Sequence, residues 1–160
     1  MAKNKARQLI SALMGIATLV GILLLLLKLP DILSESQPPV LYSLAEGCDL
    51  NNGPCTASQG NKSISVAITP EKISSLVPLV FSVTLTNINA QSVILDLQGK
   101  DMFMGINQIK LSPASDGNTW EGTAELAVCT TNTMFWRASI LAYPDETSNP
   151  EKATFEFEAK

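Results

Sequence analysis

The methionine and cysteine residues of this sequence have side chains and spacings that could form a metal site. Met102 and Met104 lie two residues apart, and Met134 precedes Trp136 by the same interval. On a β-strand, residues i and i+2 share one face, so Met102 and Met104 would present their thioethers together. Thioethers and thiolates are soft ligands that suit Cu(I). We therefore predict a soft-metal site formed by Met102, Met104, Met134 and Cys129.

The same methionines have a second interpretation, because methionine also fills irregular cores and packs against aromatic rings without binding a ligand. Cys129 and Met134 flank residues 130–133, which we expect to form the turn of a β-hairpin. A four-residue loop would place Cys129 opposite Met134. If Val128 pairs with Met134 instead, the apolar sets of both strands stay on one face, and hydrophobic patterning favours this register. Met134 and Trp136 would then point partly into the core, so the metal site and core packing both remain open.

Histidine is absent from the sequence, and this narrows the classes of site. Ser-His-Asp and Cys-His nucleophile systems, imidazole zinc sites and the commonest general base all require it. We therefore expect that the chain is not an enzyme. The one cofactor that the side chains suggest is Cu(I).

Three cysteines allow one disulfide bond and leave one thiol. Cys48 and Cys55 flank Asp-Leu-Asn-Asn-Gly-Pro, a turn that could bring the two thiols together. Alternatively, Cys129 joins one of them and links the start of the domain to a strand end. We favour the bond between Cys48 and Cys55, which would staple a small domain.

The N-terminal part of the chain carries a long apolar run. Leu9–Leu27 contains 19 residues without a charge, which at about 1.5 Å rise per residue is close to the ~30 Å hydrocarbon thickness of a bilayer. Lys3, Lys5 and Arg7 precede the run and favour a cytoplasmic N-terminus. A cleaved signal peptide has a shorter apolar region, and a buried core helix is less uniformly apolar. We therefore expect an uncleaved anchor with the rest of the chain outside the cytoplasm.

Beyond the apolar run, hydrophobic residues alternate with polar ones at a period of two, which predicts β-strands. Turn-forming residues separate the strands, and about seven short strands of this kind are typical of an antiparallel immunoglobulin-like β-sandwich. The inward-facing sets that we predict are Ile64, Val66 and Ile68; Phe81, Val83 and Leu85; Val93, Leu95 and Leu97; Trp120, Ala124, Leu126 and Val128; Met134, Trp136, Ala138 and Ile140; and Phe155 and Phe157. The expected organisation is a cytoplasmic tail at 1–8, a transmembrane helix at 9–28, a linker at 29–44 and a β domain at 45–160.

The charge of this domain limits its partners. Residues 38–160 contain 7 Lys+Arg and 13 Asp+Glu, a net charge of −6. An acidic domain without a basic stripe is not expected to bind nucleic acid or anionic lipid headgroups. The expected partners are the membrane, through the single span, and a membrane or periplasmic protein.

Three motifs of the sequence are distinctive: Cys-Asp-Leu-Asn-Asn-Gly-Pro-Cys at 48–55, Asp-Met-Phe-Met-Gly-Ile-Asn at 101–107, and Met134-Phe-Trp136 after Cys129. They resemble motifs of an uncharacterised family of single-span proteobacterial inner-membrane proteins. The resemblance covers most of the chain and implies a bacterial inner-membrane anchor with a periplasmic immunoglobulin-like domain. The Met-x-Met and tryptophan combination is also similar to small periplasmic copper- and silver-binding proteins, and the topology is loosely similar to FixH-type accessory proteins of oxidase assembly.

These observations lead to two functional hypotheses. The first is a membrane-anchored periplasmic binding or accessory module that handles Cu(I) in respiratory-enzyme assembly. The second is a metal-free interaction domain that docks a membrane partner. Binding of Cu(I) or Ag(I) by the soft donors would discriminate between them.

Overall fold

The computed structural model describes residues 13–25, 40–103, 105–127 and 133–160. The chain divides into two compact units, Met1–Gln37 and Pro38–Lys160. In the first unit, residues 13–25 form a helix. Within the described ranges, no helix is both long and apolar enough to cross a membrane. The predicted segment Leu9–Leu27 extends beyond the described residues at both ends.

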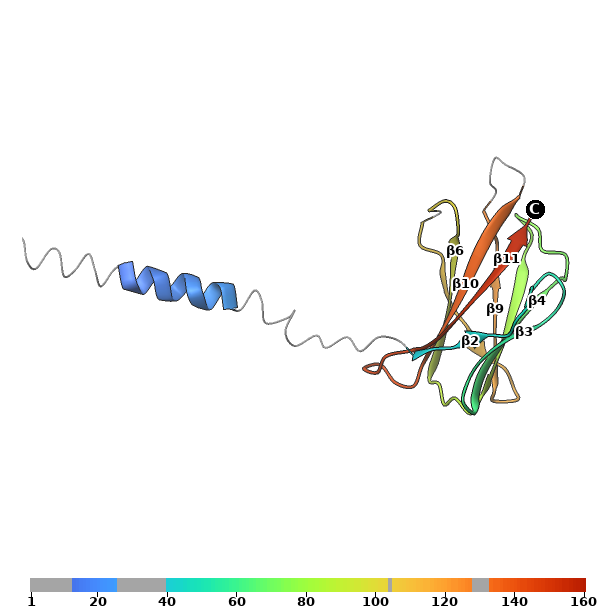
Figure 1. Ribbon diagram of the computed structural model, residues 1–160, viewed down its shortest axis with the longest axis horizontal. Coiled ribbons are helices and arrows are strands. Elements are labelled where there is room, and N and C mark those ends of the chain that lie inside the picture. Colours follow the sequence, from blue (N-terminus) through green and yellow to red (C-terminus); the bar gives the residue numbers. More distant parts are fainter. Residues whose placement is uncertain (1–12, 26–39, 104, 128–132) are drawn as a thin grey trace, which may run out of the picture. The chain divides into compact units, whose positions relative to one another are not determined.

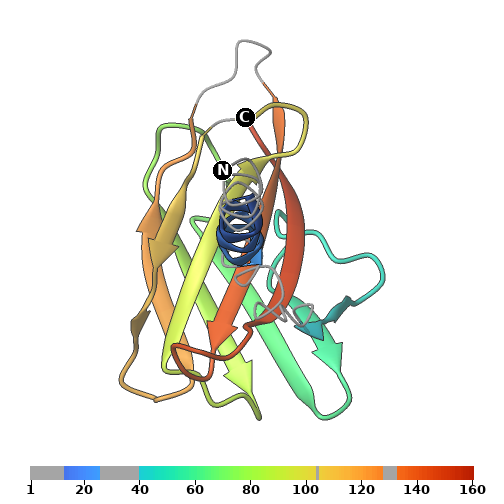
Figure 2. The same ribbon diagram turned by 90° about the vertical axis from the view of Figure 1, so that its left-hand side faces the viewer.

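The second unit consists of two β-sheets, which confirms the prediction of a mainly β domain built as a sandwich (Figures 1 and 2). Within the described residues, every strand pair is antiparallel except β1 with β11. The first sheet contains, in spatial order, β1 (Val40–Leu41), β11 (Glu151–Ala159), β10 (Met134–Tyr143), β6 (Ser92–Gly99) and β7 (Gln108–Lys110). The second contains β2 (Ser43–Leu44), β3 (Cys55–Gln59), β4 (Lys62–Thr69), β5 (Leu79–Thr86), β9 (Thr119–Ala124) and β8 (Ser112–Pro113).

The core lies between the two sheets, and the predicted alternation identifies its residues. Successive side chains of a strand point to opposite faces, so one apolar set per strand meets the facing sheet. All the predicted inward-facing residues that the structure describes are buried in one cluster; Val128 lies outside the described residues. The largest fully buried side chains include Trp136, Phe81, Phe155 and Phe157.

Among the described residues, the strands on either side of 128–132 do not pair as the predicted hairpin, because β9 and β10 belong to different sheets. β9 pairs with β5 and β8, whereas β10 pairs with β6 and β11. The segment between β9 and β10 therefore crosses from one sheet to the other. Alternating hydrophobicity shows which face of a strand is buried, but it is compatible with any neighbouring strand, so it did not reveal this crossing.

The domain begins before residue 45, inside the predicted linker 29–44. β1 pairs with β11 in one sheet and β2 pairs with β3 in the other. Tyr42 lies between them at the point where the chain changes sheets, and its backbone N–H donates to the carbonyl oxygen of Lys152 at 3.1 Å. Its hydroxyl donates to the carboxylate of Glu151, which also pairs with Lys62 Nζ at 2.6 Å. Burial, followed by the hydrogen bond to Glu151, raises the pKa of Tyr42.

Strand register defines two ends of the sandwich. At the first, which we call the entry end, Val40 pairs with Glu151, and Glu151 pairs with Ala142. At the other, which we call the far end, Trp136 pairs with Gly99 and Phe157. Ala142 lies six positions after Trp136 along β10. At ~3.3 Å per residue, the two ends are therefore about 20 Å apart.

Candidate functional site

The structure describes two of the four predicted metal ligands, whereas Met104 and Cys129 lie outside the described residues. Met102 is 53% exposed and lies in the loop between β6 and β7. The expected strand position of Met102 is therefore wrong. The backbone of Gly105, with φ of +83°, adopts the left-handed conformation that suits a turn rather than an extended strand.

Met134, in contrast, belongs to the core. It is the first residue of β10 and is only 6% exposed, and Trp136 on the same face is 1% exposed. The indole Nε1 of Trp136 is buried without a hydrogen-bond partner. These two side chains match the core-packing interpretation. Met102 and Met134 do lie at the same end of the domain, because the N–H of Lys100 donates to the carbonyl oxygen of Phe135 at 2.8 Å.

Harder metal ligands offer no alternative site in the part of the chain that the structure describes. No group of three or more histidine, cysteine, aspartate or glutamate side chains there is arranged to hold a metal ion. The soft donors of the sequence thus remain the basis for any metal hypothesis.

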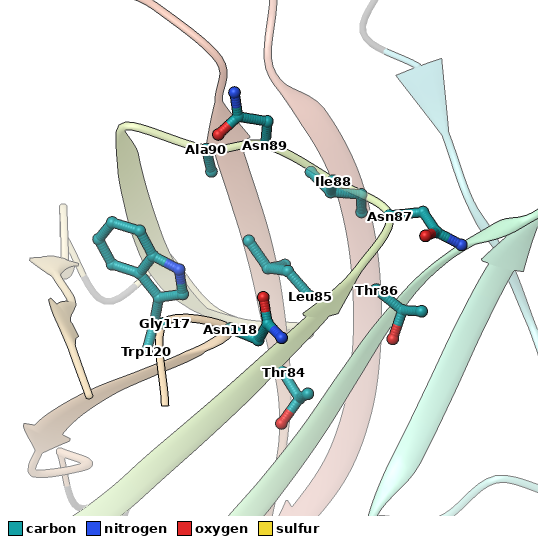
Figure 3. A pocket seen from close by; sticks show the side chains of 10 residues that line it. All are labelled: Thr84, Leu85, Thr86, Asn87, Ile88, Asn89, Ala90, Gly117, Asn118 and Trp120. Atoms are coloured by element: carbon teal, nitrogen blue, oxygen red, sulfur yellow. The ribbon is translucent and has the colours of Figure 1, made fainter. Parts of the chain in front are cut away.

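A cavity of about 560 Å³ opens at the entry end, between the loop that joins β5 to β6 and the turn that joins β8 to β9 (Figure 3). Leu85 and Trp120 lie at its floor, and Asn118 lies on the turn beside them. None of the ten residues that line it carries a charge. The pattern analysis placed Trp120 correctly in the core but did not reveal this cavity, because its two walls are far apart in sequence.

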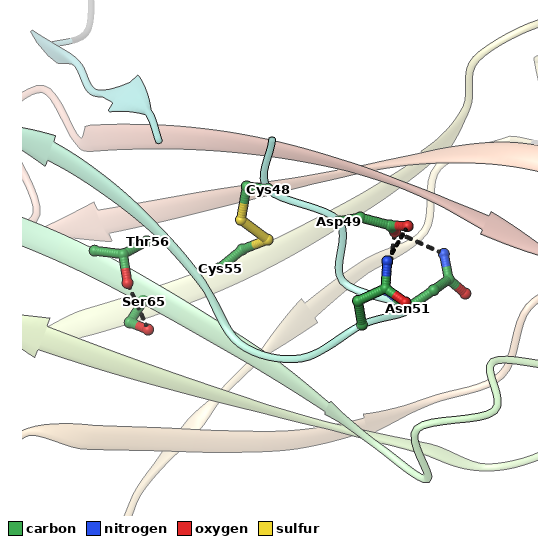
Figure 4. Close-up of a disulfide and its surroundings, with 7 residues drawn as sticks. Cys48, Asp49, Asn51, Cys55, Thr56 and Ser65 are labelled. Atoms are coloured by element: carbon green, nitrogen blue, oxygen red, sulfur yellow. Dashed lines mark hydrogen bonds between the residues drawn. A yellow bond between two sulfur atoms is a disulfide. The ribbon is translucent and has the colours of Figure 1, made fainter. Parts of the chain in front are cut away.

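The far end contains the disulfide bond between Cys48 and Cys55 (Figure 4). This is the pairing that we favoured from the sequence, and its Cα atoms are 5.6 Å apart. Inside the disulfide loop, the carboxylate of Asp49 accepts hydrogen bonds from the backbone and side chain of Asn51, both at 3.0 Å. These bonds, the backbone one first, lower the pKa of Asp49. The predicted turn is therefore held by the disulfide bond and by hydrogen bonds to the Asp49 carboxylate.

A small hollow of about 220 Å³ adjoins this disulfide, with Cys48, Lys100 and Phe135 in its wall. Lys100 Nζ pairs with Glu156 at 2.7 Å, and Arg137 pairs with the same carboxylate at 3.3 Å. The hydrogen bond from Lys100 is the largest cause of the lowered pKa of Glu156. All three side chains are about 42–43% exposed, so water screens the network and its contribution to stability is small.

Large apolar side chains are exposed together around the far end. The β6–β7 loop exposes Met102, Phe103 at 83% and Ile106 at 85%, and Phe135 lies beside the start of this loop. In the loop between β4 and β5, Leu76 is 67% exposed, and its N–H donates to the carbonyl oxygen of Leu126 at 3.0 Å. We refer to Leu76, Val77, Met102, Phe103, Ile106 and Phe135 as the far-end surface. Exposure of three large apolar side chains from one short loop is more typical of an interaction site than of ordinary surface.

Sequence reasoning selected the segment 101–107 for its sulfur atoms and overlooked its other apolar residues. Phe103 and Ile106 do not share a two-residue period, and Gly105 separates them. Apolar residues beside a glycine and without periodicity indicate an exposed loop, and this signal was available in the sequence.

Comparison with known proteins yields little. No protein-family model and no curated protein matches the sequence. A crystal structure of an engineered protein is similar over 59% of this chain and 20% of that protein, with 15% sequence identity and a TM-score of 0.38. The chain thus spans about a fifth of the length of that protein. A similarity this low supports no argument about fold or function.

Proposed function

We propose that this protein is a membrane-anchored, non-enzymatic binding or accessory module whose β domain docks a protein partner through the far-end surface. The observation that supports it is the exposure of Met102, Phe103 and Ile106 from one short loop, while the apolar side chains of the neighbouring strands are buried. Burying such side chains against a partner is favourable by about 25 cal/mol per Å² of apolar area. The net charge of −6 over residues 38–160 favours a protein over an anionic lipid surface as the partner.

The proposed location is the bacterial inner membrane, with the N-terminus in the cytoplasm and the β domain in the periplasm. The 19 uncharged residues of Leu9–Leu27 and the basic residues before them support this orientation. The bond between Cys48 and Cys55 supports an oxidising compartment for the domain. The resemblance of the 48–55 and 101–107 motifs to those of single-span proteobacterial proteins points the same way.

We further propose that the domain is immunoglobulin-like. Its central strands follow the order β4-β5-β9-β8 in one sheet and β11-β10-β6 in the other. This order corresponds to strands A, B, E and D facing G, F and C of the immunoglobulin sandwich. β7 then takes the place of an additional strand beside C.

A reporter fusion tests the location. Alkaline phosphatase, which is active only in the periplasm, should be active when fused after Lys160, and a cytoplasm-only fluorescent reporter at the same position should not. The N-terminal residues should remain attached to the mature protein. The opposite reporter pattern, or a mature N-terminus beyond Leu27, would show that the proposed anchor is wrong.

Site-specific photo-crosslinking tests the docking. A photoreactive phenylalanine analogue at Phe103 should give a discrete protein adduct in cells, and this adduct should disappear when Ile106→Ser is added. The same analogue at Leu44, an exposed apolar position on β2, is the matched control and should give no adduct. Adducts with lipid alone, or equal adducts from both positions, would contradict protein docking through this surface.

Binding of Cu(I) is the second candidate function, as part of copper handling in respiratory-enzyme assembly. The observation that favours it is that Met102 and Met134, the two described thioether residues of the predicted set, lie at the same end of the domain. Met104 and Cys129 would complete the soft donor set, since Cu(I) prefers sulfur ligands.

Titration of the reduced protein with Ag(I) or Cu(I) tests this candidate. One equivalent should bind, zinc should bind poorly, and replacing both Met102 and Met104 by Leu should abolish binding. Leu and Met have similar volumes, so the double variant should lose less than about 1.5 kcal/mol of stability. Indistinguishable titrations of parent and variant would assign these methionines to packing or docking instead.

A further inference from the structure

We infer that the entry-end cavity is a binding site for a neutral saccharide. This inference is independent of the proposed function, because the cavity and the far-end surface lie at opposite ends of β6. One wall of the cavity, the β5–β6 loop, precedes Ser92, the first residue of that strand, whereas the loop with Phe103 follows its last residue, Gly99. A ligand in the cavity would therefore leave the far-end surface accessible.

The size of the cavity suits a small molecule. Its volume of about 560 Å³ falls within the ~300–1,000 Å³ typical of ligand pockets. Trp120 and Leu85 contribute an apolar floor, the amide of Asn118 lies beside it, and Asn87 and Asn89 belong to the β5–β6 loop that forms the rim (Figure 3). An apolar floor with a few polar groups at the rim is the general composition of a site for small molecules.

Hydrogen bonds within the chain connect both walls of the cavity to their neighbours. The side chain of Asn87 donates to the carbonyl oxygen of Asn61 at 2.6 Å, which ties the β5–β6 loop to the β3–β4 turn. The carbonyl oxygen of Asn118 accepts from the N–H of Leu85 at 3.0 Å, and its own N–H donates to Asp116 at 3.2 Å. A preformed site avoids the entropic cost of ordering loops on binding.

The backbone conformation of Asn87 also shows that the cavity wall is constrained. Its φ of +56° is in the left-handed region, which asparagine tolerates better than most residues other than glycine. Its amide nitrogen donates to the carbonyl oxygen of Asn61, and this hydrogen bond holds the cavity wall in its conformation.

The polar groups that face the cavity indicate which class of ligand it would bind. The backbone groups of Asn118 hold the turn, while its side-chain amide is directed toward Leu85, and the indole nitrogen of Trp120 faces the same space (Figure 3). Amides donate and accept hydrogen bonds, as sugar hydroxyls do, and the indole adds a donor. Phosphates and carboxylates would lack a cationic partner in this lining, and a cation would lack an anionic one. A neutral, hydroxyl-rich ligand satisfies these groups best.

Nuclear magnetic resonance of the full chain tests the inference. The protein is held in a detergent without a sugar headgroup, and cellobiose or N,N′-diacetylchitobiose is added in the millimolar range. The indole N–H resonance of Trp120 and the side-chain amide of Asn118 should shift with saturation. Trp136, the other tryptophan of the chain, is buried at the opposite end and serves as an internal control.

Matched variants identify the site. Asn118→Ala should weaken binding about three- to tenfold, the effect of one lost hydrogen bond. Asn149→Ala removes an exposed amide from the β10–β11 loop, outside the cavity, and should bind as the parent does. Dispersed backbone spectra would show that each variant is folded.

Three results would overturn the inference. The first is the absence of any shift at Trp120 with both disaccharides. The second is binding that Asn118→Ala leaves unchanged, or binding that shifts the Trp136 resonance as much as that of Trp120. The third is equal or tighter binding of glucose 6-phosphate, which would show that the cavity does not select a neutral ligand.

Discussion

Gly122 on β9 lies where the two sheets leave no room for a side chain. A Cβ atom at this position would come within 2.5 Å of Cδ2 of Leu111, which is itself 2% exposed. A buried leucine moves only by displacing its neighbours, because protein interiors are close-packed. The absence of a side chain at Gly122 is thus part of the packing around Leu111, and it was not visible in the sequence.

Replacing Gly122 by Ala should therefore destabilise the domain by about 1–3 kcal/mol, the usual cost of overpacking. The β-strand preference of alanine over glycine offsets only part of this, at most about 1 kcal/mol. Urea unfolding followed by tryptophan fluorescence measures the change. Gly60→Ala is unsuitable as a control because of its positive φ, so Ser58→Ala on an exposed position of β3 provides the comparison. Equal stability of parent and Gly122→Ala would show that Leu111 can relax.

Tyr42 makes the free energy of unfolding depend on pH in the alkaline range. The Tyr42 residue is 8% exposed and its hydroxyl donates to Glu151, so burial and this hydrogen bond favour the protonated phenol and raise its pKa above the ordinary value of 10.0. The unfolded chain loses this proton at lower pH than the folded one does. The contribution of Tyr42 is therefore fully present below about pH 10 and decreases as the pH rises further.

Replacement of Tyr42 by Phe should consequently have two effects. At neutral pH it should cost about 1.5–3 kcal/mol, the range for a hydrogen bond to a charged group. Above pH 10, the free energy of unfolding should fall less steeply in the variant than in the parent. Chemical unfolding at a series of pH values measures both effects, and parallel curves for the two proteins would contradict the role assigned to Tyr42.

Among the secondary-structure elements, the short N-terminal strands depend most on their surroundings. β1 and β2 contain two residues each and lie in different sheets. Strands this short have no stability of their own, so their positions depend on the β10–β11 ladder and on β3. The Cys48–Cys55 bond closes the connection between β2 and β3 and limits the conformations of that segment in the unfolded chain.

Removing this disulfide should lower stability while retaining the fold. Closing a loop of this length contributes about 2–3 kcal/mol through unfolded-state entropy. A chain with Cys48→Ala and Cys55→Ala, compared with its parent in a Cys129→Ser background, should unfold at lower urea concentration. Its β circular-dichroism spectrum should be unchanged. A loss of the β spectrum would mean that the bond is required for the fold itself.

At the scale of the whole molecule, Pro38–Lys160 forms a compact unit with its own core. The β sandwich buries aromatic and aliphatic side chains from both sheets in one cluster. The size of this unit is in the usual range for independent domains. Its two ends carry different features, with an uncharged cavity at the entry end and exposed apolar side chains at the far end.

A fragment containing residues 38–160 should accordingly fold without the N-terminal unit. Its circular-dichroism spectrum should be that of a β protein, and its unfolding should be a single cooperative transition. A fragment starting at residue 45 lacks β1, β2 and Tyr42 and should be less stable, which makes it the matched comparison. A helix-dominated spectrum, or equal stability of the two fragments, would contradict this view of the domain.

The sequence alone was sufficient to predict the strand residues that face the core. Alternation at a period of two follows from strand geometry, and burial of one face then requires apolar residues at every second position. The turn between Cys48 and Cys55 was equally evident, because Asp49, Asn51 and Gly53 are typical turn residues and the two thiols are close in sequence.

Only the tertiary structure decided which strands are neighbours and where the functional groups meet. The alternation of β9 and β10 is compatible with a hairpin, but their pairing with β5 and β6 places them in opposite sheets. The same packing directs Met134 into the core and leaves Met102 on a loop. It also brings together the two walls of the entry-end cavity, which come from segments about 30 residues apart in the sequence. These outcomes depend on contacts that are distant in sequence, which local patterning does not encode.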